Sequence, residues 1–333
     1  MESKYQNVAS PRFYVDHYQY AFTAGLLNEN DINIESGNNI TTKKIKSLFY
    51  LNPASLKKLG TDEKLFSINE YNSYKIESNT TNYIAFLGHK NLRFQLSWFA
   101  DAAAGLLFGE ETRGSVNTDL AYNGFTIIDY DLDGGDFLGN GYGSTLSLQF
   151  LETEEEQIVN CVSIGTSYEV PYSPDLELTM TRQFGIANKK YSINGSLLTN
   201  LNYTQPPTWG DGEAWGLYTD TPTNIKARRA GRRVWNLKFS YISDSDIMSN
   251  IEMLTDSGLP DDHDYETFEI DSSFFPQFMQ KTLGGSLKFI FQPNKDDYNP
   301  DGFAICVLDQ NSISIKQVAH NTYSISLKIM EVW

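Results

Sequence analysis

Short runs in which apolar and polar residues alternate recur through the last hundred residues of the chain. The clearest run has apolar side chains at every second position, namely Tyr323, Ile325, Leu327 and Ile329. Strict alternation of this kind is typical of a β-strand that buries one face. Similar runs, bounded by Gly, Pro, Asn or Asp, occur at 234–242, 284–293 and 303–308. The pattern predicts a C-terminal sheet in which the last run is an internal strand.

Between residues 36 and 165, strand-like runs follow each other at close spacing and are separated by Gly-rich and Asp-rich turns. The run from Leu92 to Trp98 alternates with a period of two, with apolar residues at the even positions. Further runs occur at 73–77, 83–89, 125–128 and 146–150. Short strands with such turns are typical of a β-sandwich or jelly roll. We therefore expect residues 36–165 to form a β-sandwich domain.

The N-terminal segment, residues 1–35, has no clear period, because aromatic residues stand at both odd and even positions of 13–22. Two interpretations remain open from the sequence. The segment is either an extended arm that docks its rings on another surface or an ordinary first strand.

One short helix is predicted in the C-terminal half, after a capping residue among 271–273. Its apolar residues Phe275, Phe278 and Met279 recur with helical spacing. Pro276 falls in the first turn, where proline is tolerated, and Gly284 is a good stop. The fold class that follows is all-β, with two sandwich-like or barrel-like domains and one short helix in the C-terminal domain.

The composition is mainly useful because it excludes several classes of protein. The 333 residues suit two domains, and 20 Tyr with 20 Phe favour sheet over helix. The net charge of −16 argues against specific nucleic-acid binding, which needs Lys and Arg to neutralise phosphates. No stretch reaches about 18 apolar residues, so no membrane span is expected, and the N-terminus has no signal-peptide pattern. Cys161 and Cys306 each stand in an apolar run, and we expect both to be buried, reduced thiols.

The strand pattern of the C-terminal region resembles that of tailed-bacteriophage tail-tip proteins, the minor tail and distal tail protein family. The resemblance is carried by the basic loop 228–233, the run 234–242, an insert with one helix, and the three later strands. The runs 168–180 and 189–195 resemble the opening hairpin of the same module. The run 83–91 is similar to a strand of the galactose-binding-like sandwich of phage tail proteins.

The resemblance implies that residues 166–333 form a tail-tip β domain with long insert loops, and that the sandwich of 36–165 is of the jelly-roll or galactose-binding-like kind. It also implies a virion protein of the phage tail, assembled in the host cytoplasm. Identical subunits would form a ring that links the tail tube to hub or fibre proteins. Function would then reside in interfaces, with neither catalytic residues nor a cofactor.

One local motif points to a metal ion. Asp129, Asp131 and Asp133 stand at alternate positions before Gly134, as in the first half of a calcium loop, where hard oxygen ligands converge on the ion. The twelfth position is Asn140 instead of a bidentate glutamate, and the flanks are strand-like. A calcium site and a solvated acidic hairpin loop are both open, and the loop is the preferred interpretation.

A basic segment at 226–233 packs five cations into eight residues. In an acidic protein, its arginines are expected to contact acidic surfaces of a neighbouring subunit, whereas a solvated loop is the plain alternative. These arginines are Arg228, Arg229, Arg232 and Arg233. The Pro-rich and Gly-rich loop that precedes them carries Trp209 and Trp215 and is read as an insertion or interface loop.

Two other function classes are kept beside the structural one. In a carbohydrate-binding receptor-recognition protein, exposed Trp98, Trp209 and Trp215 would stack on sugar rings of a cell-surface glycan. In a glycan-cleaving enzyme, Glu152, Glu154 or Glu155 would supply a carboxylate pair, but their spacing specifies none. The four histidines lie far apart in sequence, and no nucleophile-elbow or phosphate-loop motif is present, so we do not expect an enzyme.

Overall fold

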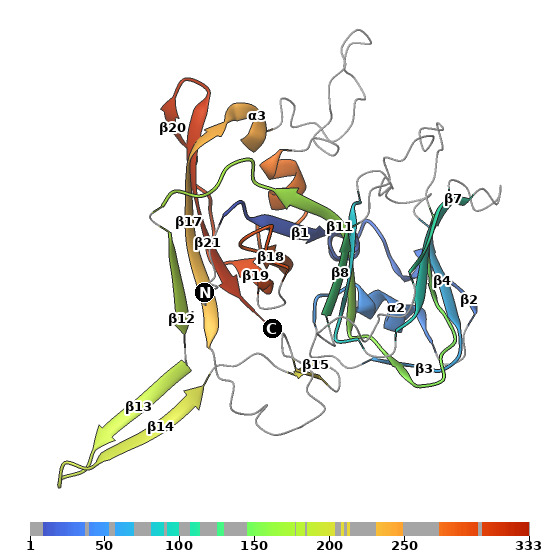
Figure 1. Cartoon of the computed structure of the whole chain (residues 1–333), viewed down its shortest axis with the longest axis horizontal. Coiled ribbons are helices and arrows are strands. Elements are labelled where there is room, and N and C mark those ends of the chain that lie inside the picture. The colour runs from blue at the N-terminus through green and yellow to red at the C-terminus, as the bar shows by residue number, and fades with distance from the viewer. Residues whose placement is uncertain are drawn as a thin grey trace.

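The computed structural model describes residues 9–36, 40–52, 57–69, 81–89, 92–99, 107–113, 125–129, 145–176, 178–183, 185–203, 208–209, 212–213, 231–248, 273–298 and 302–332. The chain is mostly β, as its sequence predicted, and its strands pair antiparallel (Figure 1). No helix within the described residues is long and apolar enough to cross a membrane.

A ten-stranded sheet runs through the whole molecule (Figure 1). Its strands, in spatial order, are β12 (Thr179–Gln183), β17 (Arg232–Ser243), β21 (Thr322–Glu331), β19 (Ala304–Leu308), β18 (Phe289–Gln292), β1 (Arg12–Asp16), β11 (Cys161–Glu169), β5 (Tyr83–Leu87) and β8 (Phe125–Asp129). The tenth strand, β20 (Lys316–Ala319), is off this path and pairs with residues 322–324 at the start of β21. The prediction that the last strand is internal is confirmed, because β21 pairs with β17, β19 and β20.

The β8–β5–β11 end of this sheet faces a second sheet of five strands. These are β2 (Ile32–Ser36), β4 (Lys64–Asn69), β9 (Thr145–Phe150), β6 (Phe94–Phe99) and β7 (Leu107–Arg113). The core between the two sheets includes Phe66, Leu148 and Ile164. The rings of Phe86 on β5 and Phe94 on β6 lie 4.3 Å apart, centroid to centroid, so the two sheets are in direct contact.

The other end of the ten-stranded sheet curls upon itself. Strands β17 and β18 are separated by β21 and β19 in the sheet, yet the ring centroids of Trp235 and Phe291 are only 5.2 Å apart. The curl encloses a second core, and a π-helix, η4 (Phe275–Gln280), lies against it. Phe278 of this helix packs on Phe13 of β1 at 4.6 Å.

The helix predicted near 271–284 is therefore present as η4, with Pro276 in its first turn. Within the described residues, four other helical segments were not predicted: α1 (His17–Ala24), η1 (Glu29–Asp31), α2 (Thr42–Leu48) and α3 (Asp244–Ile247). In α1 the first six residues are all buried, so no polar face marks the helix in the sequence. Asp16 caps it by accepting a 2.9 Å hydrogen bond from the backbone N–H of Gln19.

The N-terminal segment contains a central strand of the ten-stranded sheet. β1 lies between β11 and β18, and both of its faces are buried: Phe13 and Val15 in one core, Tyr14 in another. Burial on both faces explains the missing period in the sequence, because a strand buried on both faces needs no polar side. Residues 12–16 are thus a strand and not an arm.

The expected boundary between 165 and 166 falls inside β11, which pairs with β1 and β5 along its length. The ten-stranded sheet therefore joins strands from both sides of that boundary. Gly165 lies at a close approach of β1 and β11: a Cβ at this position would lie 1.9 Å from the carbonyl oxygen of Val15. Only glycine permits this close approach of the two backbones.

Both cysteines are buried and free, as the sequence predicted. Cys161 is in β11 and Cys306 is in β19, each with no exposed surface. Burial raises the pKa of the Cys161 thiol to about 12 and raises the pKa of Cys306 as well. Both groups are therefore protonated, unreactive core residues at neutral pH.

Candidate assembly surfaces

A two-stranded hairpin projects beyond one end of the ten-stranded sheet (Figure 1). It consists of β13 (Gly185–Tyr191) and β14 (Leu197–Tyr203), in a register that pairs Tyr191 with Leu197. The turn inside the last hydrogen-bonded pair comprises residues 193–195, and Gly195 adopts a φ of 77°. A backbone hydrogen bond of 2.9 Å from Ser192 N–H to the Ser196 carbonyl closes it. Glycine in the left-handed region at the end of a three-residue loop is a common hairpin geometry.

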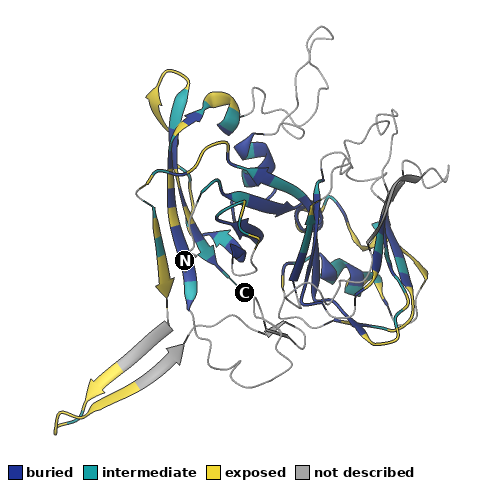
Figure 2. Ribbon diagram, in the orientation of Figure 1, coloured by how far each residue is buried: buried dark blue, intermediate teal, exposed yellow. Residues whose placement is uncertain are grey.

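The residues at the end of this hairpin are exposed (Figure 2), and four of them have large apolar side chains. Their exposed fractions are 74% for Tyr191, 106% for Ile193, 52% for Leu197 and 60% for Leu198. An isolated two-stranded hairpin is marginally stable in water, and clustered exposed apolar residues mark interaction sites. The hairpin end therefore has the character of a surface that another chain covers. We call these four residues the hairpin tip.

The hairpin also differs in charge from the rest of the chain. Lys189 and Lys190, both exposed, are the only charged residues between 185 and 203. The whole chain carries −16 and this segment +2, so the remainder carries −18. A surface of another copy would thus attract the hairpin electrostatically.

The resemblance to tail-tip proteins placed the opening hairpin elsewhere. It joined runs 168–180 and 189–195, whereas the structure pairs 185–191 with 197–203. Residues 179–183 form β12 and pair with β17 instead. The signal in the sequence was the Asn194-Gly195 dipeptide, which is a strong short-range hairpin signal when strand-like runs flank it.

The basic segment does not present Arg233 to a partner. This side chain is buried, and its guanidinium forms an ion pair with Glu331 in which Nη2 lies 3.0 Å from Oε1. The Arg233 Nε and backbone N–H both donate to Glu331 Oε2, and Nη2 also donates to the Phe303 carbonyl at 2.7 Å. Because these groups within the chain satisfy the guanidinium, the expected subunit contact of Arg233 is wrong.

Arg232 is half-buried, and its Nη1 lies 3.9 Å from the sulfur of Met330. Arg228 and Arg229 lie outside the described residues, so their role at a subunit contact stays a prediction. The backbone of Trp209 lies in β15 (Thr208–Trp209), which pairs with β16 (Gly212–Glu213). The side chains of Trp98 and Trp209, and all of Trp215, lie outside the described part of the chain.

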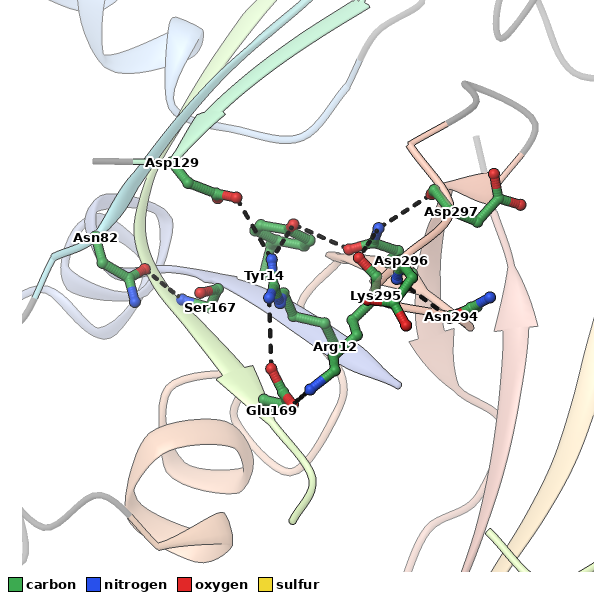
Figure 3. A network of polar contacts seen from close by, with 11 residues as sticks. Arg12, Tyr14, Asn82, Asp129, Ser167, Glu169, Asn294, Lys295, Asp296 and Asp297 are labelled. Carbon is green, nitrogen blue, oxygen red and sulfur yellow. Dashed lines mark hydrogen bonds and ion pairs between the residues drawn. The ribbon is translucent and has the colours of Figure 1, made fainter. Parts of the chain in front are cut away.

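Asp129, the first residue of the expected calcium loop, belongs to a polar network where β1, β8, β11 and the segment after β18 meet (Figure 3). Its carboxylate lies 3.4 Å from Arg12 Nη1, and the Nη2 of the same guanidinium lies 3.4 Å from Glu169 Oε2. Lys295 forms a further ion pair with Glu169. Arg12 thus bridges two carboxylates, one from β8 and one from β11, the strand that pairs with β1.

The electrostatics of this network favour a structural role. Burial, followed by the negative charge of Asp129, raises the pKa of Tyr14 to about 12, so its hydroxyl stays protonated and donates to Gln292 Oε1 at 3.0 Å. Although burial favours the neutral guanidinium, Tyr14, Asp129 and Glu169 together raise the pKa of Arg12. Burial also raises the pKa of Asp129, and Arg12 opposes that shift.

No group of three potential metal ligands is found among the described residues. Asp131 and Asp133 lie outside them, so a calcium site stays a prediction. Its first ligand, Asp129, is engaged by the Arg12 cation, which competes with a metal ion for the same oxygens.

The other residues considered for chemistry are spread over the molecule. His17 and His89 are buried, and burial lowers the pKa of both, so they are neutral residues of the interior. Glu152, Glu154 and Glu155 lie on an exposed loop between β9 and β10 (Gln157–Ile158), which pairs with β3 (Lys58–Gly60).

No protein-family model matches the chain, and no curated protein and no solved structure matches it at a significant level.

Proposed function

We propose that this chain is a structural subunit of a tailed-phage tail tip. Identical copies form a ring that links the tail tube to hub or fibre proteins in the virion, after assembly in the host cytoplasm. The observation that carries the proposal is the projecting hairpin β13–β14, whose tip exposes Tyr191, Ile193, Leu197 and Leu198 on a cationic segment of an acidic chain. A subunit whose function is assembly needs such a surface and needs no catalytic centre.

The finer fold assignment belongs to this proposal. The two facing sheets around Phe66, Phe86 and Phe94 correspond to the jelly-roll or galactose-binding-like sandwich. The curled end of the ten-stranded sheet, with η4 in it, corresponds to the tail-tip β domain. In this arrangement a single sheet joins the two parts, so the subunit would transmit load as one body.

The proposal is tested on the purified full-length chain by light scattering after size-exclusion chromatography and by negative-stain electron microscopy. We expect a closed ring with a central opening. A matched variant, in which residues 187–201 are replaced by a short Gly-Ser linker, should fold to the same circular-dichroism spectrum and remain monomeric. A wild-type chain that stays monomeric up to the highest soluble concentration contradicts the proposal.

The carbohydrate-binding alternative has no support from a described side chain, because it depended on Trp98, Trp209 and Trp215. It stays a prediction of the sequence, and binding of the purified chain to a glycan array checks it.

A further inference from the structure

A second group of exposed apolar side chains lies at the opposite end of β12 from the hairpin. Its members are Leu176 and Tyr241, with exposed fractions of 100% and 76%. Leu176 precedes β12, which begins at Thr179, whereas the hairpin follows the end of β12 at Gln183. We call these two residues the Leu176 patch.

Hydrogen bonds hold Leu176 beside Tyr241. The backbone N–H of Asp175 donates to the Lys238 carbonyl at 2.7 Å, and the Ser240 hydroxyl donates to the Asp175 carboxylate. Leu176 and Tyr241 are the sequence neighbours of the two residues in the second bond. The segment before β12 therefore continues along the edge of β17, which brings Leu176 close to Tyr241 on that strand.

The charges around the Leu176 patch complement those of the hairpin. Lys238 lies 3.7 Å from Asp175 and neutralises it. Helix α3 follows β17 directly and adds the carboxylates of Asp244 and Asp246. Lys316 lies beyond β21, on β20. The carboxylates of α3 therefore stand beside an apolar surface, as two cationic side chains stand beside the hairpin tip.

From these two surfaces we infer that the hairpin tip of one copy docks on the Leu176 patch of a second copy, in a head-to-tail contact. The inference rests on the proposed self-assembly and names the surfaces that produce it. Each strand of the hairpin has seven residues and is about 23 Å long at about 3.3 Å per residue, so the tip extends well clear of its own sheet. A tip-to-tip contact would bring Lys189 and Lys190 of both copies together, and like charges oppose it.

A contact between two different surfaces has a defined consequence for assembly. After one contact the pair of copies still has one free hairpin and one free patch, so copies add until the rotation between them closes a ring. Tip-to-tip docking would instead stop at a dimer. The polarity of the contact can therefore be read from cross-linked products.

The test uses I193C and L176C in the full-length chain. Cys161 and Cys306 are buried and free, so the wild-type chain provides a background without surface thiols among the described residues. After mild oxidation, a mixture of the two single variants should give a cross-linked dimer on a non-reducing gel, and neither variant alone should do so. The double variant should give a ladder of dimers, trimers and larger species.

The control is I34C, an exposed apolar position on β2 in the five-stranded sheet, mixed with I193C. That mixture should give no dimer above the background of the wild type. Circular dichroism must show that all variants fold like the wild type, and Y241C replaces L176C if the latter does not.

Dimers formed by I193C alone overturn the head-to-tail contact in favour of tip-to-tip docking. Oligomers seen by light scattering without any cross-link between Ile193 and the patch positions overturn the inference and leave the proposed self-assembly in place. A wild-type chain that is monomeric by light scattering overturns the proposed self-assembly itself, and the contact with it.

Discussion

Arg233 on β17 and Glu331 on β21 form an ion pair inside the protein, with side-chain exposures of 8% and 4%. The guanidinium of Arg233 also lies over the ring of Trp235, with its carbon 5.2 Å from the ring centroid. The pair links the neighbouring strands β17 and β21, and the same guanidinium reaches the Phe303 carbonyl just before β19. A residue from a basic segment, whose arginines were expected to contact a neighbouring subunit, thus links three segments of the interior.

Glu331→Gln should destabilise the fold strongly. The substitution leaves the Arg233 charge buried without its counter-charge, and removing one partner of a buried pair typically costs about 3–5 kcal/mol. The free energy of unfolding from urea titration measures the loss. Asp309→Asn, which breaks the exposed pair with Lys328, is the control and should cost about 0–1 kcal/mol. Equal effects of the two substitutions would show that the Arg233–Glu331 pair contributes no more than a surface pair.

Asp16 should make the stability depend on pH near neutrality. Burial raises its pKa from 3.8 to about 7, against the opposing hydrogen bond from Gln19. Between these two values the folded state binds the proton that the unfolded state has released. The contribution of Asp16 is therefore fully present below about pH 4 and is lost as the pH rises towards 7.

The measurement is the melting temperature of the wild type and of Asp16→Asn between pH 4 and 8. Asparagine is a good N-cap and cannot ionise, so the difference between the two proteins should shift in favour of the variant as the pH rises. Glu154→Gln, on an exposed loop, should leave the profile of the wild type unchanged. A pH-independent difference between wild type and Asp16→Asn would refute the assigned titration.

Native Cys161 and Cys306 should resist alkylation. Burial removes them from solvent and raises the pKa of both thiols, so neither access nor thiolate is available. Mass spectrometry after treatment with iodoacetamide at pH 8 should show no adduct on the folded chain. It should show two adducts in about 6 M guanidinium, which is above the roughly 5 M midpoint that marks a hyperstable domain. Rapid labelling of either thiol in the folded chain would mean that the surrounding strands open readily.

Reversing the charge of the hairpin should weaken assembly. Lys189→Glu with Lys190→Glu turns +2 into −2 on a segment that must approach an acidic chain, so sedimentation should detect assembly only at higher protein concentration than for the wild type. The wild-type assembly should itself weaken with added salt, because exposed charges are screened over about 8 Å at physiological ionic strength. Lys43→Glu, at an exposed position on α2, is the control. Assembly that is indifferent to both the double reversal and salt would argue against an electrostatic role of the hairpin.

Several elements could be read from the sequence because their signals are local. The alternation of Tyr323 to Ile329 determined a half-buried strand, since a period of two puts every second side chain on one face. Pro276 and the spacing of Phe275 and Phe278 determined the short helix, although the structure makes it a π-helix with Phe274 also buried. The apolar runs around both cysteines determined their burial. The Asn194-Gly195 turn also has a local signal, but the resemblance placed the hairpin elsewhere.

Tertiary structure alone decided how distant segments combine. The first strand enters the middle of the sheet because Phe13, Tyr14 and Val15 find apolar partners on both of its faces, and no local period records that environment. Arg233 is internal because Glu331, 98 residues later, arrives beside it and offsets the cost of burying its charge. The same holds for Leu176 and Tyr241, which come close to each other only because the segment before β12 meets β17. Such outcomes depend on pairing between strands far apart in the chain, which the pattern along one strand does not encode.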